Sequence, residues 1–161
     1  MRYSKVRDVK SPERGTDKSA GIDFFVPTEF DIMVYPHRDA LIPSGIVAEV
    51  PEGCMLMAAD KSGIATSKHA REAMGVIPKD DTFSSPVILG AKIVDEDFQG
   101  EIFIHLINLG NHPIRIKPNM KIAQFIIVPV SYESLEEVPR KKLFRAPSER
   151  GGGALGSTGI Y

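Results

Sequence analysis

The sequence has little cysteine, little net charge and no long hydrophobic run. Its one cysteine, Cys54, cannot form an internal disulfide, and its apolar surroundings predict a core residue rather than a nucleophile. A formal net charge of -1 argues against a nucleic-acid-binding protein, which would need a clear excess of Lys and Arg. No segment could span a bilayer, and the N-terminus lacks the apolar stretch of a signal peptide. We therefore expect a soluble cytoplasmic protein, with neither nucleic acid nor membrane as its partner.

What the sequence does have is a set of short strand-like runs. The 161 residues are 42% hydrophobic and 25% charged, which is ordinary for one globular domain. The 12 prolines and 14 glycines argue against long helices. The strand-like runs, rich in β-branched and aromatic residues and bounded by turn residues, are 22–26, 46–50, 54–59, 101–108 and 122–128. Only 68–74 and 134–143 have a helical composition. The pattern predicts an all-β sandwich, jelly roll or barrel.

Two segments stand apart from these runs. Residues 70–89 contain turn sequences and read as an insertion or long loop between strands. Residues 149–161 read as a loose C-terminal arm attached to a β domain of residues 1–148. In this arm Arg150 is followed by glycines and hydroxyl residues, as RGGGALGSTG. Glycine backbone N–H groups can close on an anion, and the arginine fork suits phosphate oxygens. The alternative is a polar tail without a function.

Four internal clusters carry polar groups at the ends of the apolar runs. Asp23 follows a glycine turn, and Lys61-Ser62-Gly63 combines a cation, a hydroxyl and an accessible N–H in one turn, which suits phosphate oxygens. Residues 94–100 read as a hairpin that carries Asp95, and Gln124 lies inside an apolar strand. Taken singly, these clusters are equally compatible with a polar turn, an ordinary hairpin and a satisfied structural amide.

Taken together, the clusters resemble the five motifs of the trimeric deoxyuridine triphosphatases (dUTPases). In chain order the matching segments are AGID at 20–23, KSGIA at 61–65, IVDEDFQGE at 93–101, MKIAQF at 120–125 and RGGGALGSTG at 150–159. Five weak motifs in the right order form a strong signal. The resemblance implies a jelly-roll-like β-clip barrel of the dUTPase type, assembled as a homotrimer with a flexible glycine-rich C-terminal arm. Three active sites would lie at the subunit interfaces.

The resemblance also implies an activity and a role for each residue. The activity is a dUTP diphosphatase, which hydrolyses dUTP to dUMP and pyrophosphate with Mg2+. Asp95 would activate the water that attacks the α-phosphate, and Asp23 would support the metal indirectly, through water. The substrate-binding residues implied by the motifs are Lys61, Ser62, Gly63, Ile93, Val94, Phe98, Gln124, Arg150, Leu155, Gly156 and Ser157.

Four positions depart from the family pattern. Lys61 replaces an arginine, Phe98 a tyrosine and Leu155 an aromatic residue, while Lys92 stands where a glycine is usual. These departures favour a divergent lineage such as a virus, in which case the location would be the host cytoplasm. Two alternatives stay open. One is a related pyrimidine nucleotide enzyme, such as a dCTP deaminase-like protein or another dNTP pyrophosphatase. The other is a non-enzymatic regulatory protein on the same fold.

Overall fold

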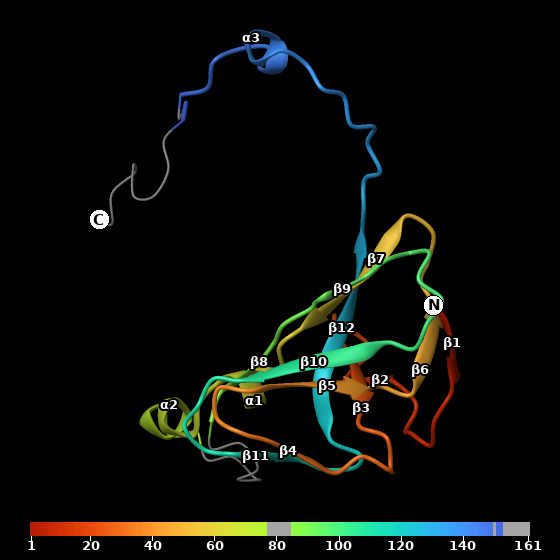
Figure 1. The fold of residues 1–161 in the computed structure, drawn as a ribbon, viewed down its shortest axis with the longest axis vertical. Coiled ribbons are helices and arrows are strands. Elements are labelled where there is room, and N and C mark those ends of the chain that lie inside the picture. Colours follow the sequence, from red (N-terminus) through yellow and green to blue (C-terminus); the bar gives the residue numbers. More distant parts are fainter. Residues whose placement is uncertain (77–84, 150, 153–161) are drawn as a thin grey trace. The chain divides into compact units, whose positions relative to one another are not determined.

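The computed structural model describes residues 1–76, 85–149 and 151–152, which belong to two compact units (Figure 1). The first unit is Met1–Ser131 and the second is Tyr132–Tyr161. The strands of the first unit are β1 (Arg2–Lys5), β2 (Glu13–Arg14), β3 (Ile22–Phe25), β4 (Ile32–Val34), β5 (Asp39–Pro43), β6 (Ile46–Glu49), β7 (Cys54–Ala59), β8 (Val87–Leu89), β9 (Ile93–Val94), β10 (Phe103–Asn108), β11 (Ile114–Ile116) and β12 (Lys121–Pro129). The helices are α1 (Ser62–Ala65), α2 (Lys68–Ala73) and, in the second unit, α3 (Arg140–Leu143). The predicted boundary after Ser148 falls inside the second unit.

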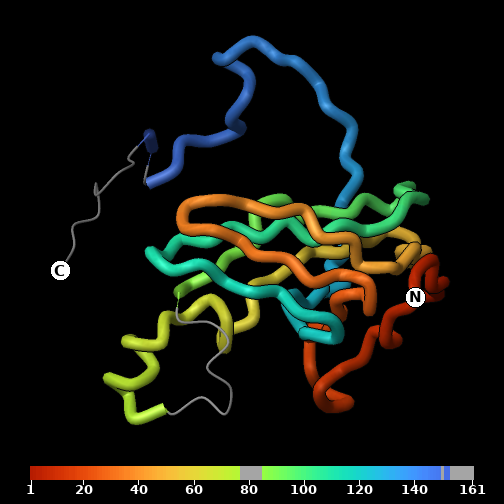
Figure 2. The backbone as a smooth tube through the Cα atoms, turned by 60° about the horizontal axis from the view of Figure 1, so that its bottom comes forward, coloured from red at the N-terminus to blue at the C-terminus, as the bar shows by residue number. Residues whose placement is uncertain are grey.

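The strands of the first unit form antiparallel sheets, which confirms the all-β prediction. The largest sheet has the order β2-β3-β12-β7-β9, and a second has the order β5-β10-β8. Two further pairs are β1-β6 and β4-β11. Figure 2 shows the β4-β11 and β5-β10 pairs crossing the unit side by side. The nine-residue β12 is central to the large sheet, since it pairs with β3 on one side and β7 on the other.

The core follows from the period of two in the strands. In β10, alternate residues are buried and their neighbours face outward, as expected of a strand with one face on the core. Phe24 and Phe125 meet at the centre of the large sheet with ring centroids 4.4 Å apart. Among the described residues, every buried hydrophobic side chain lies between Val9 and Phe125. The described part of the second unit therefore adds nothing to this core.

The helices agree only in part with the sequence prediction. Helix α2 matches the predicted 68–74, and Ser67 caps it by accepting the Ala70 N–H at 3.2 Å. Of the predicted helix at 134–143, only Arg140–Leu143 is helical, and the prediction of a helix at 134–139 is wrong. No side chain of 134–143 is buried, and a short helix without a packed face is marginal in water. The end of the predicted 70–89 insertion is β8, which pairs with β10, whereas 77–84 lies outside the described residues.

Candidate functional site

Three of the motif-like segments meet where β7 ends. The central strand β12 places Gln124 opposite Asp23 on β3 and opposite Ala59 on β7. Lys61 lies two residues after the end of β7 and directly precedes the one-turn helix α1, which begins at Ser62. The structure therefore brings together Asp23, Gln124 and the turn 61–63.

Ion pairs orient the charged groups of this cluster. Asp23 is buried, and its carboxylate pairs with Lys61 through Oδ1 and with Lys121 Nζ, 3.3 Å from Oδ2. Lys121 also donates to Glu13 at 2.7 Å, and this hydrogen bond, followed by the one that it donates to Asp23, raises the pKa of Lys121 above its usual range. Both oxygens of Asp23 therefore have cationic partners, and the Lys61 ammonium is held in place beside the turn.

The amide nitrogen of Gln124 has a hydrogen-bond partner within the chain. Its Nε2 donates to the backbone carbonyl of Asp60 at 3.1 Å. Gly21 packs against the same side chain, because a Cβ at Gly21 would lie 2.7 Å from Gln124 Cδ. Gly21 is thus the residue that leaves room for the amide. The turn has a further support in Arg71 of α2, which donates to the Gly63 carbonyl.

The third motif-like segment forms β9 and the turn after it. In β9, Val94 pairs with Leu56 and Ile93 with Met57 of β7. The Phe98 N–H donates to the Asp95 carbonyl at 3.2 Å, which closes the turn and leaves the Asp95 carboxylate exposed. The Phe98 ring is 43% exposed and lies over Gly100, where a Cβ would come within 2.7 Å of Phe98 Cζ. The ring can therefore lie against the backbone of residue 100 only because that residue is glycine.

Within one chain, Asp95 and the Lys61 turn lie at opposite ends of β7. Because β9 runs antiparallel to β7 with Val94 opposite Leu56, Asp95 lies level with Met55. Lys61 follows the other end of the strand, so the two residues are about 20 Å apart along it, at roughly 3.3 Å per residue. A single chain therefore does not join Asp95 to the cluster around Gln124.

Asp60 is a site residue that the sequence did not predict. Its Oδ1 accepts the Leu89 N–H at 2.6 Å and its Oδ2 pairs with Lys92 Nζ at 3.1 Å. Lys92, which stands where the family has glycine, thus directs its ammonium to Asp60. The only signal in the sequence was its position directly before Lys61.

His105 is a second residue that the sequence did not single out. Its Nδ1 accepts the Ala91 N–H at 3.2 Å, so its Nε2 carries the proton and donates to Asp39 Oδ2 at 2.9 Å. This hydrogen bond is the main reason that the pKa of Asp39 lies below its usual range. Gly90 allows the close approach, because a Cβ there would lie 2.6 Å from His105 Cε1. Asp60 and His105 therefore hold the chain just before β9.

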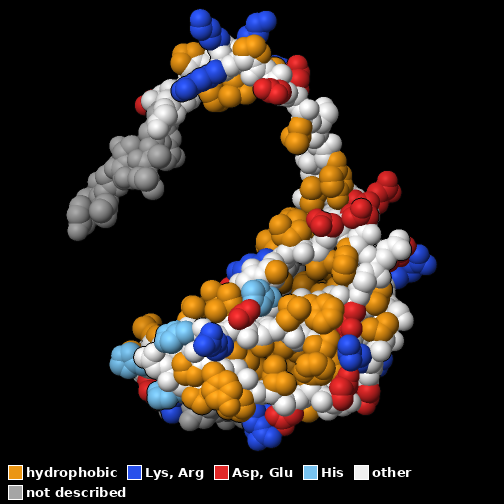
Figure 3. Space-filling view, in the orientation of Figure 1, with side chains coloured by type: hydrophobic (Ala, Val, Ile, Leu, Met, Phe, Trp, Pro, Cys, Tyr) orange, Lys and Arg blue, Asp and Glu red, His pale blue; other side chains and the backbone are white. Residues whose placement is uncertain are grey.

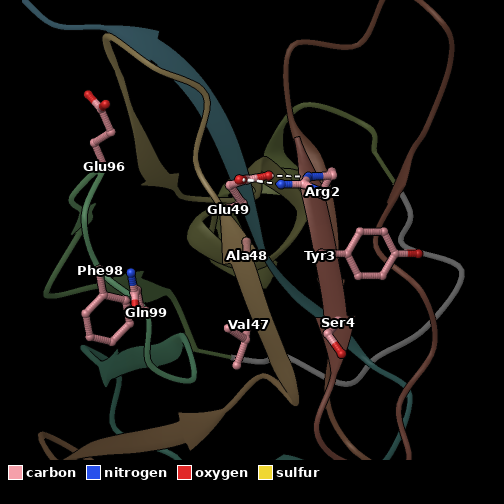
Figure 4. Close-up of a pocket in the computed structure, with 9 residues that line it drawn as sticks. All are labelled: Arg2, Tyr3, Ser4, Val47, Ala48, Glu49, Glu96, Phe98 and Gln99. Atoms are coloured by element: carbon pink, nitrogen blue, oxygen red, sulfur yellow. Dashed lines mark hydrogen bonds and ion pairs between the residues drawn. The ribbon is translucent and has the colours of Figure 1, made fainter.

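A hollow of about 540 Å³ lies on the Phe98 side of the turn (Figure 4). In Figure 4 Phe98 and Gln99 stand on one wall and the β1-β6 pair, with Arg2 bound to Glu49, forms the other. Phe98 is the only predicted substrate-binding residue among those that line this hollow, which includes neither Asp95 nor the Lys61 turn. The chemistry of the site therefore does not reside in this hollow alone.

The remaining predicted site residues belong to the C-terminal arm. Arg150, Leu155, Gly156 and Ser157 lie outside the described residues. In residues 1–76, 85–149 and 151–152, no three side chains of His, Cys, Asp or Glu gather closely enough to hold a metal ion. None of the described helices has the length and apolar character of a membrane span.

Comparison with known proteins identifies the relatives of this chain. The dUTPase family profile matches residues 83–159. A deoxyuridine 5'-triphosphate nucleotidohydrolase of Dictyoglomus turgidum is 32% identical over 159 residues, which cover 96% of this chain and 93% of the relative.

Solved structures share the fold. The dUTPase of Staphylococcus bacteriophage 80alpha, a G164S mutant with dUpNHpp, superposes with a TM-score of 0.78 at 21% identity and covers 99% of this chain and 98% of its own. The dUTPase of phage phi11 of S. aureus, in which a structural Mg(II) ion is coordinated, has a TM-score of 0.67 at 18% identity and covers 85% of this chain and 95% of its own.

Proposed function

This chain belongs to the dUTPase family, and we propose that it hydrolyses dUTP to dUMP and pyrophosphate. Family membership rests on the relative that is 32% identical over nearly the whole length of both chains. The observation that carries the proposal is that Asp23, the Lys61 turn and Gln124 meet at one end of β7, while Asp95 is exposed on the adjacent strand edge. The resemblance to the family motifs assigns phosphate binding to Lys61 and Gln124, water activation to Asp95 and indirect support of the metal to Asp23.

Asp95 is the general base in this account. Its carboxylate accepts a proton from water while the water oxygen attacks the α-phosphorus. The new bond joins that oxygen to the α-phosphorus, and the bond from the α-phosphorus to the bridging oxygen breaks, so that pyrophosphate leaves. A positioned carboxylate contributes about 10²–10⁴-fold to such a step. Its exposure in the single chain supports access to a substrate.

Phosphate binding falls to the turn at the end of β7 and to the C-terminal arm. The Lys61 ammonium, the Ser62 hydroxyl and the Gly63 N–H are donors within one turn, and Gln124 lies beside them. Transfer of Lys61 from Asp23 to a phosphate oxygen keeps the ammonium paired. Arg150, with Gly156 and Ser157, would cover the terminal phosphates and exclude water.

Recognition of the nucleoside falls to β9 and Phe98. Backbone amides and carbonyls at Ile93 and Val94 can match the donors and acceptors of uracil, and cytosine would leave them unpaired. The partly exposed Phe98 ring offers a flat surface to the deoxyribose, where a ribose 2'-hydroxyl would clash or lose its water. Leu155 would cover the base by dispersion.

We propose a homotrimer with active sites at the subunit interfaces. The separation of Asp95 from Lys61 by the length of β7 supports this, because a neighbouring chain must then supply one of them. Exposed apolar side chains also support it. Leu41 is 59% exposed and Phe103 46% exposed on the outer face of the β5-β10 pair, where Figure 3 shows hydrophobic side chains gathered.

Mg2+ is the metal we propose. Both oxygens of Asp23 are paired with lysines, and the described residues gather no set of three metal-binding side chains. This donor set fits an ion held by triphosphate oxygens and water, with Asp23 acting through water, as Mg2+ prefers. When bound, the ion neutralises charge on the triphosphate and orients it.

A deaminase would need an acid/base carboxylate beside the amino group of the base, and Glu101, at the end of the 93–101 segment, does not supply it. Glu101 accepts hydrogen bonds from Arg7 at 2.7 Å and from the Gly45 N–H at 2.9 Å. Its carboxylate is therefore committed to the β6 side of the unit rather than to a nucleobase. The location we propose is the cytoplasm, or the host cytoplasm if the lineage is viral, which subcellular fractionation would test.

The mechanism is tested by Asp95→Asn. An amide cannot accept the proton of water, so we expect kcat for dUTP to fall by about 10²–10⁴-fold. Binding of a non-hydrolysable dUTP analogue should stay within about twofold of the parent, since charge on Asp95 is not needed to hold phosphate. Pyrophosphate release measures the first quantity and calorimetry the second. A variant that turns over at the parent rate would show that another group is the base.

A further inference from the structure

Asp60 connects the two motif-like segments that flank β7. It is the residue after the last residue of β7, and Lys61 follows it. Its carboxylate reaches two groups just before β9, the Leu89 N–H and the Lys92 ammonium. Its backbone carbonyl accepts the Gln124 amide. One residue thus touches the segment that leads to Asp95 and the strand that carries Gln124.

The two side-chain contacts of Asp60 differ in strength for physical reasons. Leu89 is 2% exposed, and a buried backbone N–H needs a partner. The carboxylate supplies a charge-assisted hydrogen bond of 2.6 Å, and such bonds are stronger than neutral ones. The side chains of Lys92 and Asp60 are 42% and 29% exposed, so water screens their ion pair and the pair orients Lys92 more than it stabilises the fold.

These contacts fix where β9 begins. The Lys92 carbonyl accepts the Ala58 N–H at 2.6 Å, so the residue is held by its backbone to β7 and by its side chain to Asp60. Ile93 follows directly. A shift at Lys92 would therefore move the backbone groups of Ile93 and Val94, and Asp95 after them.

We propose that Asp60 is a positioning residue for dUTP hydrolysis, an inference that rests on the proposed function. With Lys92 as its partner, it holds the β9 segment in the place from which the backbone meets the base and Asp95 meets the water. It touches neither substrate nor reacting atoms. Small displacements of reacting groups lower rates steeply, which is why such a residue matters.

Two variants separate the contacts of Asp60. Asp60→Asn keeps an oxygen for the Leu89 N–H and loses the charge that pairs with Lys92. Lys92→Met keeps the length of the side chain and leaves the Asp60–Leu89 bond intact. A matched control is the exposed ion pair between Asp31, the residue before β4, and Arg115 on β11, which are 2.7 Å apart and are tested as Asp31→Asn and Arg115→Met. Each variant is assayed for kcat and KM with dUTP, for its melting temperature and for exchange of the Leu89 amide proton.

We expect Asp60→Asn and Lys92→Met each to lower kcat about tenfold, with KM within about twofold of the parent. The double variant should be no slower than the slower single one, because both changes remove the same pair. Melting temperatures should fall no further than those of the control variants, which keep the parent kcat. The Leu89 amide proton should exchange faster in Asp60→Asn and at the parent rate in Lys92→Met, because only the first change weakens the hydrogen bond from the Leu89 N–H to Asp60.

The results that overturn the proposal are distinct from those that overturn the function. If the parent releases pyrophosphate from dUTP and both variants keep its kcat, Asp60 has a structural role only. A structural role only would also follow if kcat fell in step with the melting temperature from one variant to the next and if the effects of Asp60→Asn and Lys92→Met were additive in the double variant. If the parent itself releases no pyrophosphate from dUTP, the proposed function fails and the positioning role fails with it.

Discussion

Gly21 and Gln124 illustrate how single residues shape the site. The glycine is buried on the large sheet, and its missing side chain is the space that the Gln124 amide occupies. The amide in turn contacts the backbone of Asp60, one residue before the phosphate turn. The motif around Asp23 therefore contributes to the site partly because Gly21 has no side chain that would collide with Gln124.

Gly21→Ala should impair the site more than the fold. The new methyl group must push Gln124 from the Asp60 carbonyl, so we expect kcat/KM for dUTP to fall about tenfold. Overpacking should lower the free energy of unfolding by about 1–3 kcal/mol. Kinetics and urea denaturation measure the two quantities. Gly15→Ala is the control, because its Cβ would meet only Ser19 Oγ at 3.5 Å. Parent kinetics in Gly21→Ala would refute the role of this contact.

At the scale of elements, the hydrogen bond between His105 on β10 and Asp39 on β5 gives the pair a defined pH dependence. This bond, more than the other contributions, lowers the pKa of Asp39. A carboxylate whose pKa is lower in the folded state stabilises the fold above its unfolded pKa. That stabilisation is lost as the pH falls through the folded value.

Asp39→Asn should therefore lower the melting temperature near neutral pH, by a small amount because the carboxylate is exposed. The difference from the parent should shrink as the pH falls below the pKa of Asp39. Calorimetry across this pH range measures the effect. Asp31→Asn serves as the comparison, because it removes an exposed carboxylate that is paired with Arg115. A difference that persists undiminished below the pKa of Asp39 would contradict the assignment of Asp39 as the hydrogen-bond acceptor.

How well the sequence predicted each element depended on how local its signal was. The run at β7 is apolar and bounded by Gly53 and Asp60, so it was predicted with its observed bounds. β5 was missed because its apolar run is only three residues long, between Asp39 and Pro43, and its place is set by pairing with β10. Helix α1 was missed because Ser62 and Gly63 are poor helix formers.

The candidate site also contains residues that the sequence could predict and residues that it could not. Asp95 and Gln124 were identified from the order of five motifs. Asp60 and His105 were not, since their partners lie 29 and 14 residues away, and only the strand pairing brings them together. Contacts of this kind depend on topology, which periodicity alone does not reveal.

At the scale of the whole molecule, the described core and the C-terminal arm are separable. Every buried hydrophobic side chain among the described residues lies in the first unit. Ending the chain after Ser148 should therefore leave the melting temperature nearly unchanged while most dUTP hydrolysis is lost with Arg150 and the residues that follow. Circular dichroism and pyrophosphate release measure the two. A truncated chain that fails to fold would show that the arm is structural, for example as a strand exchanged between subunits.

The central claim concerns the substrate, and a nucleotide panel tests it most directly. The purified parent protein is incubated with Mg2+ and, separately, with dUTP, dCTP, dTTP and UTP, and pyrophosphate and ammonia are both measured. Pairing of the β9 backbone with uracil, together with packing of Phe98 against the deoxyribose, predicts fast pyrophosphate release from dUTP and little from dCTP, whose base is mismatched, or from UTP, whose sugar carries the 2'-hydroxyl. Ammonia release from dCTP, equal pyrophosphate release from all four nucleotides, or no turnover of dUTP would each contradict the account.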